Sequence, residues 1–147
     1  MTMAEELFFP ATVFIYPESD EGVDFTRENT LELLSRPTYK PNYFYAPVVL
    51  PEGATVVSLV LFYQDNDTFS NMNFKLTRLN MYKQNELTMA EYTTSGSSWL
   101  DKKIKVTSIN FRIIHNGGYV YRLRAEFSRA SSRLVLYGIK IVYKPAP

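Results

Sequence analysis

The sequence predicts an all-β fold: a two-sheet antiparallel β-sandwich, in the first instance a jelly roll, with a closed barrel as the alternative. The first observation is the alternation of side chains over residues 119–127, because successive side chains of a strand point to opposite faces. The second is an aromatic content of 15%, with eleven Tyr and ten Phe, residues that favour half-buried sheet surfaces. The third is the recurrence of turn signals about every ten residues, as in sandwiches of short strands.

The segment 119–127 has one apolar face and one charged face. The apolar face consists of Tyr119, Tyr121, Leu123, Ala125 and Phe127. The opposite face consists of Val120, Arg122, Arg124 and Glu126. We therefore expect the first set in the core and the second set in contact with water.

The composition fits one domain and argues against several chemistries. The chain has 147 residues, of which 46% are hydrophobic and 21% charged, enough to bury about two-thirds of the unfolded surface. It has no Cys, and its one His, His115, precedes Asn116-Gly117 and is expected in a hairpin turn. Zinc sites need several nitrogen or sulfur ligands, and no phosphate-binding or nucleophile-elbow motif is present. We expect no enzyme activity, cofactor or metal, and find no signal peptide or membrane-span pattern.

Proline and charge divide the chain into an acidic N-terminal segment, 1–42, and a sandwich body, 43–147. Six of the eight prolines lie at or before Pro51. Residues 1–52 contain nine acidic and three basic residues, whereas residues 53–147 contain six acidic and thirteen basic residues. Opposite charges attract, so the segment is expected to dock either on its own body or on a neighbouring copy.

The N-terminal segment is expected to be irregular. Residues 11–16 are rich in strand formers and predict a strand that Pro17 ends, followed by an acidic loop over 18–24. Residues 26–34 predict one or two helical turns, with Thr26 as the N-cap and Leu31 and Leu34 facing inward.

Seven further segments of the body predict strands: 43–50, 55–63, 72–81, 87–93, 104–114, 119–127 and 133–143. The first is expected at an edge because it contains Pro47, and the second is apolar on both faces, as in a central strand. The third changes phase between Leu76 and Leu79, which predicts a bulge. Asn116-Gly117 predicts a hairpin between the strands on either side. In the last strand, one face is expected to carry Val135, Tyr137, Ile139, Ile141 and Tyr143.

Two groups of residues are candidates for binding. Arg122, Arg124 and Arg133 form a possible interface for an acidic segment; nucleic acid is a weaker interpretation, because the net charge is only +1. The second group is Asp65, Asp67 and Trp99. The two carboxylates are explained by a turn more readily than by calcium, and a single Trp lies more often in a core than on a binding platform.

The chain resembles, from Tyr43 onward, a family of uncharacterised bacterial β-sandwich domains. The resemblance rests on residues 46–56 (APVVLPEGATV), on 62–66 (FYQDN), on Met89-Ala90 followed by Ser95-Gly96, and on 119–123 (YVYRL). It covers about two-thirds of the chain and implies a fold without a catalytic residue. Where related chains read Ile-Asp-Asn before the aromatic strand, this one reads Ile114-His115-Asn116.

The first functional hypothesis is a non-enzymatic protein that works by self-assembly. Its N-terminal segment would dock on the basic sheet face or cover a neighbour's edge strand, and this predicts a stable homo-oligomer. The alternative is a carbohydrate-binding module that uses Trp99, Asp65 and Asp67. A buried Trp99 would argue against that alternative.

Overall fold

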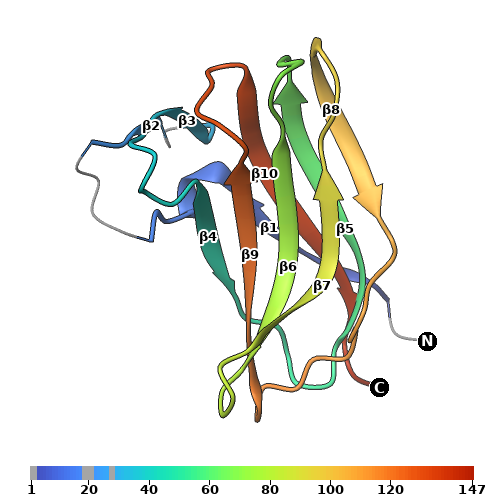
Figure 1. Ribbon diagram of the computed structural model, residues 1–147. Coiled ribbons are helices and arrows are strands. Elements are labelled where there is room, and N and C mark those ends of the chain that lie inside the picture. Colours follow the sequence, from blue (N-terminus) through green and yellow to red (C-terminus); the bar gives the residue numbers. More distant parts are fainter. Residues whose placement is uncertain (1–2, 18–21, 27–28) are drawn as a thin grey trace.

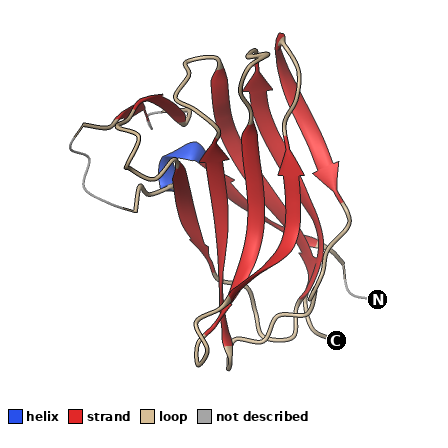
Figure 2. Ribbon diagram, viewed as in Figure 1, coloured by secondary structure: helices blue, strands red, loops and turns tan. Residues whose placement is uncertain are grey.

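The computed structural model describes residues 3–17, 22–26 and 29–147, and its regular structure consists almost entirely of strands (Figure 2). Two four-stranded antiparallel sheets face each other (Figure 1). The first has the order β1 (Glu5–Pro10), β10 (Leu134–Lys144), β5 (Thr55–Asp65) and β8 (Ser98–Val106). The second has the order β4 (Tyr43–Val48), β9 (Tyr119–Phe127), β6 (Met72–Asn80) and β7 (Glu86–Thr93). The predicted two-sheet antiparallel sandwich is confirmed.

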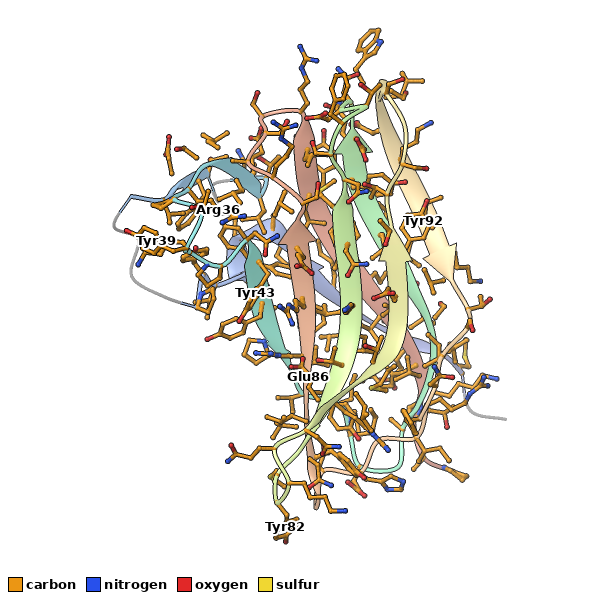
Figure 3. All side chains as sticks on the ribbon, in the orientation of Figure 1. Arg36, Tyr39, Tyr43, Tyr82, Glu86 and Tyr92 are labelled. Carbon is orange, nitrogen blue, oxygen red and sulfur yellow. The ribbon has the colours of Figure 1, made fainter. Side chains whose placement is uncertain are left out.

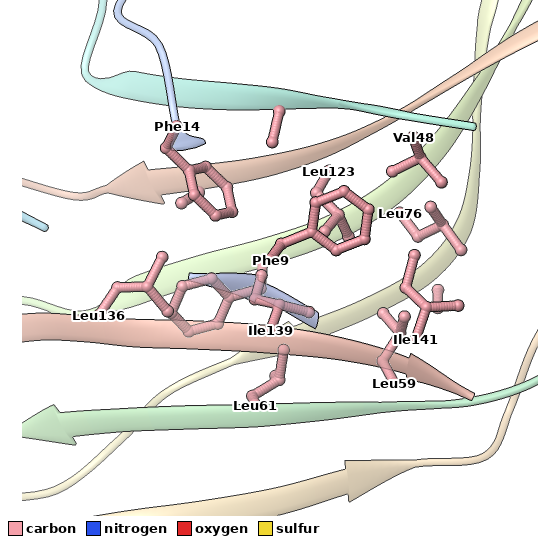
Figure 4. Close-up of a cluster of buried hydrophobic side chains, with 14 of the residues drawn as sticks. Phe9, Phe14, Val48, Leu59, Leu61, Leu76, Leu123, Leu136, Ile139 and Ile141 are labelled. Carbon is pink, nitrogen blue, oxygen red and sulfur yellow. The ribbon is translucent and has the colours of Figure 1, made fainter. Parts of the chain in front are cut away.

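The core lies between the two sheets (Figure 4). Strand β9 contributes as its alternation predicts: Tyr121 is 4% exposed and Leu123, Ala125 and Phe127 are fully buried, whereas Val120 is 48% exposed. The largest of the fully buried side chains are four phenylalanines, namely Phe14, Phe44, Phe74 and Phe127. Strand β5 lies inside its sheet, between β10 and β8, as its apolar sequence predicts.

Strand β10 differs from its predicted face assignment because it contains a bulge. Its register with β5 shifts between Leu136 and Gly138, so Leu136 and Ile139 both lie in the core. Tyr137 is only half-buried, and its side chain lines the outer face of the sheet instead. The predicted bulge of β6 lies instead in its neighbour β7: Leu76 and Thr77 pair with Ala90 and Thr88, so that Met89 is the extra residue, while β6 pairs with β9 without a register shift.

The predicted elements of the N-terminal segment are wrong. The strand predicted over 11–16 is absent there: the strand of this region is β1, which ends at Pro10, and it is followed by a short 3₁₀ turn, η1 (Ala11–Val13). In place of a helix over 26–34, β2 (Asp24–Thr26) pairs with β3 (Glu32–Ser35). Leu31 and Leu33 are both fully buried, a spacing of two that belongs to a strand. The predicted acidic loop, 18–24, lies mostly outside the described residues.

The N-terminal segment packs on its own chain. Strand β1 pairs with β10 over its whole length, and single bridges join Ile15 to Tyr45 and Leu31 to Leu136. Phe14 and Leu31 belong to the same core as the body. Self-assembly through this segment stays a prediction, since a single chain does not test it.

The predicted strand 104–114 is wrong in its second half. Strand β8 starts at Ser98 and ends at Val106, and residues 107–118 form a loop that leads to a turn at His115 and Gly118. Phe111 has φ +52°, a left-handed conformation that is rare for a bulky residue. The guanidinium of Arg78 lies 3.9 Å from the ring centre of Phe111 and 4.1 Å from that of Tyr119, and this stack holds the loop on the sandwich.

Candidate functional site

Arg122 and Arg124 lie on the outer face of the β4-β9-β6-β7 sheet, as their alternation predicts. Arg122 donates two hydrogen bonds to the carboxylate of Glu86, at 3.0 Å and 2.7 Å, and its guanidinium lies 5.5 Å from the Tyr45 ring centre. The guanidinium of Arg124 lies 3.8 Å from the Tyr43 ring centre. Figure 3 labels Tyr43 and Glu86 on this sheet. Both guanidinium groups therefore already have partners within the chain.

The Arg122–Glu86 pair is also visible in the pKa values of its two groups. Burial raises the pKa of Glu86, but the hydrogen bonds from Arg122 and Thr77 outweigh it and the net shift is downward. The hydrogen bond to Glu86 raises the pKa of Arg122. Arg133 lies apart from this pair, in the loop before β10 of the other sheet, where its carbonyl accepts a bond from Asn66 N–H. Of the three arginines predicted to form one interface, Arg122 and Arg124 are thus neighbours on β9, whereas Arg133 lies next to the other sheet.

Asp65 and Asp67 hold three loops together at one end of the sandwich. Asp65 is 3% exposed and accepts hydrogen bonds from the Thr94 hydroxyl and from Asp67 N–H. Asp67 accepts hydrogen bonds from Phe69 N–H at 2.9 Å and from the Ser131 hydroxyl at 2.8 Å. Within the described ranges, no group of three or more His, Cys, Asp or Glu side chains is placed to hold a metal ion.

Trp99 lies at the same end and is exposed. Its side chain is 74% exposed, and its carbonyl accepts a hydrogen bond from the Gln64 side chain. Phe69, in the loop between β5 and β6, and Leu100, next to Trp99 in β8, are 86% and 59% exposed. Exposed apolar side chains that gather in one place can mark a binding surface, whereas single ones are common. Asp65 is therefore a buried residue whose hydrogen bonds join two loops, whereas the side chain of Trp99 is accessible to a ligand.

A shallow groove begins two residues after Trp99, on the outer face of the β1-β10-β5-β8 sheet. It has a volume of about 320 Å³ and is lined by Phe62, Asp101, Lys102, Lys103 and Tyr137. The Tyr137 hydroxyl donates a hydrogen bond to Asp101 at 2.8 Å. Burial and this bond raise the pKa of Tyr137, so the phenol stays protonated. The groove therefore combines aromatic rings, a carboxylate acceptor and two ammonium donors.

Two of the groove residues could not be assigned to it from the sequence. Tyr137 was expected on the face of Ile139, but the bulge before Gly138 turns it outward. Gly138 was the available signal, because an isolated Gly within a strand often marks a bulge. Asp101 lies where the register between β5 and β8 shifts, and the period-two pattern does not extend through such an irregularity.

The comparisons with known proteins bear on the fold. Neither a protein-family model nor a curated protein sequence matches the chain. It is similar to the solved structure of the C-terminal CBM6 of LamC, a marine laminarinase from Zobellia galactanivorans, with a TM-score of 0.52 and 11% identity over 93% of this chain and 98% of that one. For the xylan-binding module CBM15 the TM-score is 0.48 and the identity 10%, over 99% of each chain. At such identities the likeness to CBM6 shows a shared β-sandwich fold.

Among the described residues, no helix is long and apolar enough to cross a membrane.

Proposed function

We propose that this chain is a non-catalytic carbohydrate-binding module whose ligand lies along the outer face of the β1-β10-β5-β8 sheet, from Trp99 into the groove lined by Phe62 and Tyr137. The observation that carries the proposal is the exposure of Trp99, 74%, two residues before Asp101, which lines a groove together with Lys103 and two aromatic rings. A sugar ring has apolar C–H faces and polar hydroxyl edges. An exposed ring stacks on the first, while a carboxylate and an ammonium group bond the second.

The outer face of the other sheet fits a sugar less well. The guanidinium of Arg124 lies 3.8 Å from the ring centre of Tyr43, and that of Arg122 lies 5.5 Å from the ring centre of Tyr45. A ligand would have to displace the closely stacked Arg124 before it stacked on Tyr43. Among the described residues, no aromatic or cationic group lies over the Trp99 ring, so its faces are open to a ligand.

The likeness to CBM6 guides the choice of ligands to test. That structure is a module of a laminarinase, which makes β-glucans the first neutral probes. The identity is 11%, so the proposal rests on Trp99 and the groove of this chain.

The test is binding of the purified chain to immobilised laminarin, xylan and a broad glycan array, compared with Trp99→Ala. We expect at least one glycan to bind and Trp99→Ala to weaken it about tenfold or more, the loss typical of a central aromatic contact. Asp101→Asn should also weaken binding. Tyr82→Ala is the matched control, because Tyr82 is 86% exposed in the turn between β6 and β7 and lies outside the groove. Absence of any glycan ligand, or equal losses for Trp99→Ala and Tyr82→Ala, would contradict the proposal.

A further inference from the structure

A second groove continues the first one across the same sheet. It has a volume of about 400 Å³, and Lys103 lines both grooves. Its floor includes Ser58, Val60 and Val142, and its rim carries Lys103, Lys105 and Lys140. A polymer that occupied the aromatic groove would therefore pass next over a floor with three lysines at its edges.

The strand register places these lysines in order. Val60 of β5 pairs with Lys105 of β8 on one side and with Lys140 of β10 on the other. Paired residues share a face of the sheet, and neighbouring strands lie about 4.8 Å apart. Lys105 and Lys140 therefore stand on either side of Val60 with backbones about 10 Å apart. Lys103, two residues along β8, points to the same face.

Acidic side chains only partly balance this surface. Lys140 pairs with Glu6 at 3.2 Å, and the ammonium of Lys103 lies 5.8 Å from the ring centre of Phe62. For Lys105, no ion pair with a described residue is recorded. Asp101 is already bonded to Tyr137. The two grooves together contain more ammonium groups than carboxylates, so they attract an anionic ligand.

We infer that the ligand is an acidic polysaccharide, whose carboxylates lie among Lys103, Lys105 and Lys140 while its sugar rings lie in the aromatic groove. The inference rests on the proposed function and adds the chemical class of the glycan. Nucleic acid is the competing polyanion, and it would use the lysines without requiring sugar contacts at Trp99.

The experiment uses polygalacturonate, alginate and hyaluronate, each beside its carboxyl-esterified form, and measures affinity by calorimetry. We expect an acidic form to bind at least tenfold more tightly than its ester, and Lys103→Gln/Lys105→Gln to remove most of that difference. The difference should shrink as salt is raised, because the lysines are exposed. Lys83→Gln, in the exposed turn after β6, is the control that keeps wild-type affinity.

The outcomes separate the two proposals. Equal affinity for acid and ester forms, or binding of neutral glycans alone, overturns the acidic-ligand inference and leaves the carbohydrate proposal intact. Loss of all glycan binding overturns both. Single-stranded DNA that binds more tightly than any acidic polysaccharide, with the same dependence on Lys103 and Lys105 and none on Trp99, identifies nucleic acid as the ligand instead.

Discussion

At the scale of single residues, Asp67 shows how one carboxylate orders the end of a loop. The nearby Ser70 hydroxyl and the hydrogen bonds that Phe69 N–H and the Ser131 hydroxyl donate to it together lower its pKa from 3.8 to about 2. These bonds connect the β5–β6 loop to the β9–β10 loop, next to Trp99. The ionised form of Asp67 is thus favoured in the folded chain.

Asp67→Asn should make the chain less stable in a way that depends on pH. The folded pKa lies below the unfolded one, so the contribution of the carboxylate is complete above about pH 5 and disappears as pH falls through about 2. Thermal unfolding midpoints should be measured for wild type and Asp67→Asn from pH 2 to pH 7. The midpoint of wild type should exceed that of the variant by a constant gap above about pH 5, and this gap should shrink as the pH falls toward 2. Glu126→Gln is the control, since the described residues show no hydrogen bond to the Glu126 side chain. A gap of the same size at every pH would contradict the prediction.

The face of the sheet to which a side chain points could be predicted from the sequence, but the residues that it contacts could not. The alternation of β9 correctly places Arg122 and Arg124 on the outer face. Their partners come from other strands: Glu86 is 36 residues away from Arg122 in sequence. Such pairs depend on which strands become neighbours, and this is a property of the topology. The exposure of Trp99 likewise depends on the irregular start of β8.

At the scale of elements, the patterns that succeeded are long and regular, and those that failed are short or interrupted. Strand β9 repeats the period-two pattern over nine residues, whereas β2 and β3 have three and four residues. In 26–34, leucines three residues apart fit a helix, and tertiary packing of Leu31 against β10 decides for a strand. A bulge causes the wrong face assignment in β10, because one extra residue exchanges the two faces of a strand.

At Gly138, the packing of β1 on β10 leaves no room for a side chain. A Cβ atom there would lie 2.5 Å from the Phe8 ring and 3.0 Å from the Phe9 carbonyl oxygen. Gly138→Ala should therefore destabilise the chain by about 1–3 kcal/mol in urea unfolding, the cost of overpacking. Because the ring tip of Phe8 is the closest contact, Phe8→Ala/Gly138→Ala should lose less than the sum of its single variants. Additive losses would show that the backbone contact with Phe9, rather than the ring, limits the site.

At the scale of the whole molecule, the acidic segment and the basic body meet along one sheet edge. Glu6 pairs with Lys140, and the Tyr143 hydroxyl donates to Glu5 at 2.8 Å. The acidic segment and the basic body therefore contact each other where β1 pairs with β10. These contacts are on the surface and stabilise the chain weakly. The larger effect of β1 is to occupy the backbone groups of β10, which would otherwise form an open edge.

Deleting residues 1–10 should make the chain associate into larger species. The deletion uncovers the edge of the eleven-residue strand β10 and removes Phe9, which is 8% exposed, from the core. Light scattering should therefore give a larger mass for the truncated chain than for the full chain of 17.0 kDa, while far-ultraviolet circular dichroism reports that the sheets persist. A full chain that is a homo-oligomer, and that the deletion reduces to monomers, would show instead that β1 is exchanged between copies. That result would favour assembly as the function, because the same edge that β1 covers here would then be the joint between molecules.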